Sequence, residues 1–292
     1  MKQGLQLSNK EIDSIIDLAL SEDVSQGDVT SEALMPPELQ GRASIMAEAG
    51  GILAGIEVVK RVFFKVDPLL KTRVLIKDGA KVRPGDTVAT ISGRVVSVLR
   101  GERVVLNFLS RLSGIATYTA RFVAEVVGYN VLISDTRKTT PGLRRLEKYA
   151  VSVGGGRNHR FHLGDGILIK DNHITALRAQ GMSLQDIVLR AKQDAPKNLK
   201  IEVEAGTAGE ALEAAEGGAD IVMLDNINPD EMHRIKALLP ENVMIEASGG
   251  ISLKNVRAAA QAGVDIISVG ALTHSAQALD FSLDFEPGTI KN

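Results

Sequence analysis

Short apolar runs recur through the C-terminal half of the chain, and each ends in a charged or glycine-containing cluster. Segments with helical periodicity separate several of these runs, at 208–216, 229–239 and 253–262. Strands that alternate with helices at this spacing predict βα units and a parallel sheet. In a barrel of such units the active site lies where the C-terminal ends of the strands meet. The six runs are 131–134, 167–169, 201–203, 221–224, 244–247 and 266–269.

The N-terminal part of the chain has a different pattern. Ser8 and Glu11 have the spacing of a capping box, which predicts the start of a first helix. Residues 74–79 and 86–91 are expected to form antiparallel strands, because glycine-containing turns separate these short apolar runs. Residues 101–124 carry the apolar stripe of a helix.

The change of pattern divides the chain. We expect an α+β domain at 1–115 and a domain of βα repeats at 116–275. The periodicity fades beyond that point, so we expect the tail 276–292 to pack on the first domain.

Composition excludes some classes of protein. A formal net charge of −2 over 292 residues argues against a general nucleic-acid binder, which usually has a basic excess. The absence of cysteine excludes disulfides and thiolate chemistry, and it fits a cytoplasmic protein. No apolar stretch reaches the roughly 18 residues needed to span a bilayer, so no membrane association is expected.

Cations gather just after the predicted strands. Arginine grips carboxylates and phosphates with a planar fork, and lysine adds a compact charge. A solvated charged loop is the alternative for one such cluster, but repetition at successive strand ends favours a pocket for a polyanionic substrate. The cations are Arg137, Lys138 and Arg144 within 135–144, then Arg160 and Lys170, with His159 beside them.

Carboxylates also stand at two strand ends. Glu204 and Asp225 close successive strands, and Glu202 shares a strand face with Glu204. A carboxylate in a barrel mouth needs a cation, hydroxyl or metal as partner. Glu204 and Asp225 can therefore hold Mg²⁺, directly or through water, or accept hydrogen bonds from ribose hydroxyls. Ion pairs with the neighbouring cations are the alternative.

Glycines follow the last two predicted strands. Ser248, Gly249 and Gly250 precede a helix expected to start near Ser252, and Gly270 follows the next strand. Glycine lets backbone N–H groups approach an anion closely, and barrels of this kind often bind phosphate after their last strands. The pair of glycine clusters therefore predicts a phosphate site.

Together, these motifs resemble the type II phosphoribosyltransferases, and most closely the quinolinate phosphoribosyltransferase family. The resemblance implies an N-terminal α/β sandwich domain and an incomplete, seven-stranded α/β barrel. It also implies Mg²⁺-dependent conversion of quinolinate and phosphoribosyl pyrophosphate to nicotinate mononucleotide, pyrophosphate and CO₂ in NAD biosynthesis, by a homodimer or higher oligomer. Further matching segments are 22–23, 27–31, 101–103, 112–117, 169–173, 223–226, 246–251 and 268–275.

The resemblance also assigns roles to residues. The catalytic candidates are Lys138, Lys170, Glu204 and Asp225. The quinolinate carboxylates would meet Arg137, His159, Arg160 and Lys170, with Arg103 reaching in from the partner subunit. Phosphoribosyl pyrophosphate would meet Lys138 at its pyrophosphate, Glu204 and Asp225 at its ribose and Mg²⁺, and Ser248, Gly249, Gly250 and Gly270 at its 5′-phosphate.

Two other functions remain open at this point. One is a related phosphoribosyltransferase that acts on another aromatic base, such as nicotinate or the substrate of a molybdenum-transport-associated relative. Arg103, Arg137 and Arg160 together favour a dicarboxylate over a monocarboxylate. The other is a non-catalytic barrel that binds phosphate or nucleotides, which would lack some of the carboxylates or arginines at the strand ends.

Overall fold

The computed structural model describes residues 7–291, which form two compact units. The first unit takes the residues up to Ala120, then Thr139–Gly155, and those from Leu272 onward; the second takes Arg121–Lys138 and Gly156–Ala271. Residues 1–6 and 292, which fall within the ranges expected for the first domain and the tail, lie outside the described residues.

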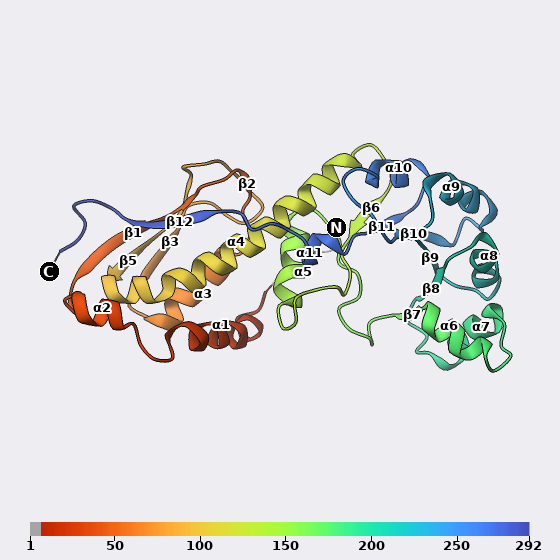
Figure 1. Cartoon of the computed structure of the whole chain (residues 1–292), viewed down its shortest axis with the longest axis horizontal. Helices are drawn as coiled ribbons and strands as arrows, with labels where there is room; N and C mark the ends of the chain where they lie inside the picture. Colours follow the sequence, from red (N-terminus) through yellow and green to blue (C-terminus); the bar gives the residue numbers. More distant parts are fainter. Residues whose placement is uncertain (1–6, 292) are drawn as a thin grey trace. The chain divides into compact units, whose positions relative to one another are not determined.

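The first unit is built on a four-stranded antiparallel sheet with the order β12-β1-β5-β3. Burial alternates along β1, so one face of this sheet is packed, and helices α3 and α4 lie on one side of it (Figure 1). The strands are β1 Gln40–Ala47, β3 Lys71–Val74, β5 Thr87–Arg94 and β12 Phe281–Phe285, with a small ribbon of β2 Gly51–Ile52 and β4 Lys81–Val82. The helices are α1 Asn9–Val24, α2 Val29–Leu34, α3 Ile56–Val66, α4 Val95–Glu125 and α5 Arg144–Val153.

Of the antiparallel pair expected at 74–79 and 86–91, the second strand is confirmed, but the first is wrong beyond Val74. β5 covers most of the second range, but its partner β3 ends at Val74. The ladder stops there because the N–H groups of Leu75 and Ile76 both donate to one carbonyl, that of Val88. The chain then turns through Gly79, whose φ of 87° is easily adopted only by glycine.

The second unit is a six-stranded parallel sheet with the order β6-β11-β10-β9-β8-β7. All six apolar runs form its strands, as predicted, and α6 to α10 follow one another around its outer side (Figure 1). The strands are β6 Leu132–Ser134, β7 Ile167–Ile169, β8 Ile201–Ala205, β9 Ile221–Asp225, β10 Met244–Ser248 and β11 Ile266–Ser268. The helices are α6 Asp171–Arg178, α7 Leu184–Asp194, α8 Ala208–Glu216, α9 Pro229–Leu238 and α10 Val256–Gln261, and α11 Ala271–His274 follows β11.

The sheet is open, which agrees with an incomplete barrel, but it has six strands among the described residues instead of the expected seven. A seventh position is marked by one parallel bridge between Ser134 and Arg157. The chain leaves the sheet there because the next two residues are held by a side chain: Asp135 accepts hydrogen bonds from the Asn158 amide and the His159 backbone N–H.

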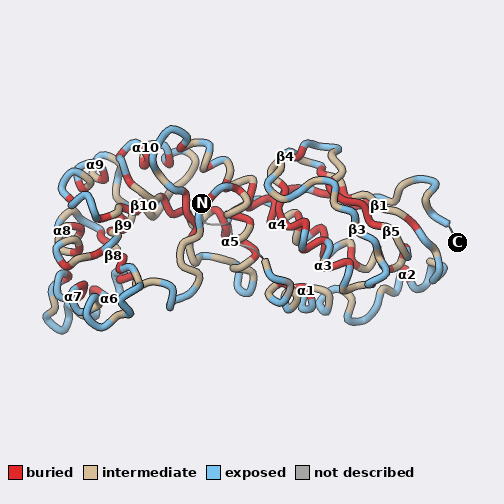
Figure 2. The backbone as a smooth tube through the Cα atoms, turned by 180° about the vertical axis from the view of Figure 1, so that it is seen from behind, coloured by how far each residue is buried: buried red, intermediate tan, exposed pale blue. Residues whose placement is uncertain are grey.

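Side-chain caps fix where several outer helices begin. Ser183, Thr207 and Asn228 each accept a hydrogen bond from a backbone N–H in the first turn of α7, α8 and α9. Buried stretches follow the strands of each unit, as Figure 2 shows. Across residues 7–291, no helix combines the length and apolar character needed to cross a membrane.

The expected domain boundary near residue 115 falls within α4. This helix runs without a break from Val95 to Glu125, and it contributes residues to both units. It begins earlier than the predicted 101–124 because Val95 and Val98 continue its apolar stripe into the core.

Candidate active site

A cavity of about 390 Å³ opens at the C-terminal edge of the parallel sheet. Its lining comes from the ends of β7, β8, β9, β10 and β11 and from two loops, one after β6 and one before β7. All of these residues belong to the second unit. They are Thr136, Arg137, Lys138, His159, Arg160, Leu168, Lys170, Glu204, Met223, Asp225, Glu246, Ser248 and Ser268.

Most candidates from the sequence lie in this lining. Gly249, Gly250 and Gly270 do not line the cavity, although they follow β10 and β11 at the same edge of the sheet. Arg103 is exposed on α4 in the first unit and is not a lining residue. The candidates found in the lining are Arg137, Lys138, His159, Arg160, Lys170, Glu204, Asp225 and Ser248.

Sequence reasoning missed a second layer of lining residues. Each lies on a strand two positions before a candidate at or just beyond the strand end: Leu168 before Lys170, Met223 before Asp225, Glu246 before Ser248, and Ser268 before Gly270. Residues two apart on a strand share a face. The alternation of strand side chains was therefore the signal that would have found this layer.

Two arginines form the most basic part of the lining. Burial lowers the pKa of Arg160, and the neighbouring charge of Arg137 lowers it further. Arg160 donates through Nη1 to the Gly166 carbonyl at 3.1 Å, and within the described chain its buried Nε has no hydrogen-bond partner. Two guanidinium groups that repel each other, with an unpaired donor on Arg160, are suited to an anion with more than one carboxylate.

Glu204 and Asp225 form the acidic part of the lining. Burial raises the pKa of Glu204; the charge of Lys170 opposes this effect, and the charge of Asp225 adds to it. Lys170 Nζ lies 3.9 Å from Glu204 Oε2, too far for a hydrogen bond. Two carboxylates that repel each other, with a lysine beyond hydrogen-bond distance, are suited to bind a divalent cation such as Mg²⁺, because such ions prefer oxygen ligands.

The loop after β10 is fixed by a residue after β9. Asn226 has a left-handed φ of 57°, the only such non-glycine in the described residues. Its amide Nδ2 donates to Asp225 Oδ2 at 2.8 Å, and its backbone N–H donates to the Ser248 carbonyl. A Cβ on Gly249 would lie 2.5 Å from Asn226 Oδ1, so this contact requires glycine.

The helix expected to start near Ser252 begins instead at Val256. Residues 251–252 are irregular and residues 253–255 form a turn, with the side chain of Asn255 accepting from the Ser252 backbone N–H at 2.7 Å. Any phosphate held here would therefore meet the N–H groups of the glycine loop and not the first turn of a helix.

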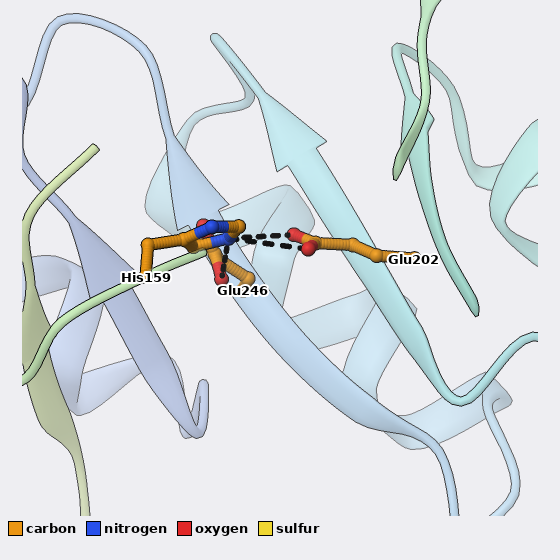
Figure 3. A group of neighbouring side chains, drawn as sticks. All are labelled: His159, Glu202 and Glu246. Atoms are coloured by element: carbon orange, nitrogen blue, oxygen red, sulfur yellow. Dashed lines mark hydrogen bonds and ion pairs between the residues drawn. The ribbon is translucent and has the colours of Figure 1, made fainter. Parts of the chain in front are cut away.

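His159 lines the cavity, and its ring contacts two glutamates, Glu202 and Glu246 (Figure 3). Its Nε2 is 3.1 Å from Glu202 Oε2 and 3.5 Å from Glu246 Oε2. Glu202 is 5% exposed and Glu246 is fully buried. Burial of the ring opposes its protonation, but the two carboxylates outweigh that effect and raise the pKa of His159 to about 10.

The second ring nitrogen has a contact that favours the neutral ring. Nδ1 lies 2.9 Å from the Arg160 backbone nitrogen, which donates to it. One amide hydrogen bond contributes about 1 kcal/mol. A charge pair at this separation contributes about 5 kcal/mol at an effective dielectric constant of ~20, so the carboxylates favour the charged ring at neutral pH.

Comparison with known proteins identifies the family. The family model described as "Quinolinate phosphoribosyl transferase, N-terminal domain" matches residues 28–113, and the C-terminal domain model of the same family matches residues 115–284. The carboxylating nicotinate-nucleotide pyrophosphorylase of Rattus norvegicus is 42% identical over 257 residues, which cover 86% of this chain and 84% of that protein.

Bacterial proteins are similar over nearly the whole chain. A probable carboxylating nicotinate-nucleotide pyrophosphorylase of Bacillus subtilis is 42% identical over 278 residues, covering 95% of this chain and 94% of the relative. The crystal structure of NadC from Streptococcus pyogenes has a TM-score of 0.91 at 41% identity, and the match covers 97% of this chain and all of that one. On these matches, and with both domain models present in order, the chain belongs to the quinolinate phosphoribosyltransferase family.

Proposed function

We propose that this protein is a quinolinate phosphoribosyltransferase that forms nicotinate mononucleotide, pyrophosphate and CO₂ from quinolinate and phosphoribosyl pyrophosphate, in NAD biosynthesis. The observation that carries the proposal is the cavity at the strand ends, which is lined by four arginine and lysine side chains and three carboxylates. Family membership supports the same reaction, because relatives of this chain are named carboxylating nicotinate-nucleotide pyrophosphorylases. We expect the reaction to take place in the cytoplasm, an expectation that rests on the cysteine-free composition.

The basic part of the cavity would bind quinolinate. Arg137 and Arg160 present two guanidinium groups, and Lys170 adds a third charge. Quinolinate carries two carboxylates, so each can meet a cation. Nicotinate lacks one of them and would leave buried positive charge without a partner, which costs roughly 1–3 kcal/mol.

The acidic part would act on the ribose. Departure of pyrophosphate takes the bonding electron pair from C1 and leaves positive charge on the ribose, which Glu204 and Asp225 can stabilise. The pyridine nitrogen of quinolinate then forms the new bond to C1. Lys138 would bind the departing pyrophosphate, and Ser248 with the loop of Gly249 and Gly250, together with Gly270, would bind the 5′-phosphate.

Decarboxylation would follow bond formation. The bond from C2 to its carboxylate breaks, CO₂ leaves, and the electron pair stays on C2 beside the positively charged ring nitrogen. A proton from solvent then completes nicotinate mononucleotide. This order needs no side-chain nucleophile, which agrees with a cavity lined by anion-binding groups and carboxylates.

Mg²⁺ fits the donors in the cavity. Glu204 and Asp225 would hold the ion, directly or through water, and its bound charge would offset that of the pyrophosphate. The raised pKa of Glu204 comes first from burial, and a bound cation would offset that cost and favour the ionised carboxylate.

We further propose a homodimer, or a higher oligomer, with shared sites. Arg103 belongs to the first unit and is exposed on α4, although family resemblance gives it a role at quinolinate. An exposed arginine with that role is suited to the site of a partner subunit.

The substrate can be tested directly. The purified protein is incubated with Mg²⁺, phosphoribosyl pyrophosphate and either quinolinate or nicotinate, while nucleotide and CO₂ are measured. We expect kcat/KM for quinolinate to exceed that for nicotinate by at least about tenfold, the factor that corresponds to 1.4 kcal/mol. Equal values would instead identify a phosphoribosyltransferase for a monocarboxylate.

A further inference from the structure

The ring of His159 contacts carboxylates from two different strands. Glu202 comes from β8 and Glu246 from β10, and both point at the same ring nitrogen, Nε2 (Figure 3). Both oxygens of Glu246 are buried, and within residues 7–291 neither makes a hydrogen bond, so His159 is the ion-pair partner of that carboxylate. Asp135 also fixes the backbone at this position, because its Oδ1 accepts a hydrogen bond from the His159 backbone N–H at 2.9 Å.

The direction of the Nε2 proton follows from this arrangement. A neutral ring has its proton on Nε2, because Nδ1 faces the Arg160 N–H as an acceptor. A charged ring carries a proton on both nitrogens. In either state Nε2 is a donor that faces the two carboxylates: Glu202 lies within hydrogen-bond distance, and Glu246 is an ion-pair partner at 3.5 Å.

The same three side chains have the spacing of a metal site, with their ligand atoms all within 4.8 Å of one another. The contact at Nδ1 argues against that use. A histidine that binds a metal through Nε2 normally donates a hydrogen bond from Nδ1, whereas Nδ1 of His159 faces a donor.

Packing of the sheet does not require carboxylates at the positions of Glu202 and Glu246. Leu168 and Met223 occupy the same inner layer of the lining, so this depth of the sheet accepts apolar side chains. Burial of an ionised carboxylate costs several kcal/mol unless a partner offsets it, and apolar replacement of buried ion pairs is often neutral or stabilising. Two buried glutamates at one imidazole therefore indicate a role at that ring.

We propose that Glu202 and Glu246 are positioning residues that fix the His159 ring on the cavity wall and direct its Nε2–H away from bound substrate. Within the proposed function, on which this inference rests, His159 then meets quinolinate with the edge or face of its ring and not through Nε2–H. Glu202 lies outside the cavity lining, and Glu246, which belongs to it, is fully buried, so both glutamates act on quinolinate binding through the ring.

The test combines a spectroscopic and a binding measurement. In protein labelled with ¹⁵N-histidine, the signals of His159 are assigned by their absence from His159→Gln. Glu202→Leu and Glu246→Leu each remove a carboxylate that faces Nε2, and we expect each to shift the His159 Nε2 signal or broaden it by proton exchange. By calorimetry the quinolinate Kd should rise about tenfold, the effect of losing one buried hydrogen bond, while kcat at saturation stays within about threefold.

Conservative variants separate positioning from simple folding effects. Glu202→Gln and Glu246→Gln keep an oxygen that can accept Nε2–H, so quinolinate binding should recover toward the wild-type value while the Nε2 signal moves to that of an amide partner. Asp265→Asn is the matched control: it alters a partly exposed ion-paired carboxylate at the other end of the sheet and should change neither measurement. If the leucine variants do not fold, the Nε2 shift in the glutamine variants decides the matter.

Two results would overturn the proposal. One is a His159 Nε2 signal that is unchanged in the glutamine variants. The other is a folded leucine variant that binds quinolinate as tightly as the wild type. Failure of the wild-type protein to bind quinolinate would count against the proposed function, and the ring signals would still report whether the glutamates hold His159.

Discussion

At the scale of single residues, carboxylates and arginines in the cavity should matter at different stages of the reaction. Asp225→Asn keeps the shape of the side chain and removes its charge. If that charge stabilises the ribose as pyrophosphate departs, kcat should fall by roughly a hundredfold, about 2.7 kcal/mol of barrier. The quinolinate Kd should change little, because cations hold that ligand.

Arg160→Ala is the opposite case and should weaken quinolinate binding first. Calorimetric titration with quinolinate, alongside steady-state kinetics of both variants, distinguishes the two roles. Loss of quinolinate binding in Asp225→Asn, with kcat intact at saturation, would show that the role assigned to this carboxylate is wrong.

A second residue-scale prediction concerns Asn226. Its left-handed backbone is costly for other side chains with a Cβ, by roughly 1–2 kcal/mol, and costs glycine nothing. Asn226→Ala should therefore be less stable in urea unfolding than Asn226→Gly. Both variants lose the hydrogen bond to Asp225, so both should have a reduced kcat. Equal stability of the two variants would contradict the backbone argument, and normal kcat would contradict the support of Asp225.

At the scale of secondary-structure elements, the cluster around His159 joins a loop to β8 and β10. Because its folded pKa of about 10 lies above the ordinary value near 6.5, the proton on His159 stabilises the fold below pH 6.5. That contribution is lost as the pH rises toward 10.

The comparison of wild type with His159→Gln measures this contribution. We expect the difference in free energy of unfolding between the two to shrink steadily from pH 7 to pH 10 in urea titrations. If the difference in free energy of unfolding stays constant from pH 7 to pH 10, the imidazole of His159 is already neutral at pH 7.

The strands of the parallel sheet were predictable because each is a short apolar run that ends in polar residues. Element lengths were less predictable: α4 starts before its expected first residue, and α10 is shorter than 253–262 because residues 253–255 form a turn instead. The missing seventh strand follows from Asp135, whose side chain draws residues 158–159 out of the ladder. A contact of this kind between a side chain and a distant loop has no sequence period.

The site was predictable to the extent that it lies at strand ends. His159 was a candidate from the sequence and Glu246 could be found by counting two residues back from Ser248, but their contact could not be predicted because His159 lies in an irregular loop. The direction of that ring depends on Glu202, Glu246 and Asp135 together, and only the folded backbone brings them close.

At the scale of the whole molecule, a shared site makes a prediction for mixed subunits. Arg103→Ala and Arg137→Ala should each be nearly inactive. If Arg103 completes the partner's site, a mixed dimer has one site with both changes and one with neither. Exchange of the two variants should then restore up to about a quarter of the wild-type sites, the share for random assortment in a symmetric dimer.

The measurement is the activity of the mixture after subunit exchange, with mass spectrometry of the intact assembly to show that mixed dimers form. Mixed dimers without activity would mean that Arg103 and Arg137 serve a site within one chain.

The pairing of β1 with β12 has a consequence for the order in which the protein can fold during synthesis. Ala47 pairs with Phe281, and Ala43 with Phe285. A ribosome that adds roughly 5–20 residues per second needs roughly 10–50 s to make the intervening stretch of about 230 residues. The nascent chain can pair β1 with β5 early, but the other edge of β1 stays uncovered until the last part of the chain emerges. An uncovered strand edge is what neighbouring chains pair with, so the first unit is exposed to aggregation for longer than its position early in the sequence would indicate.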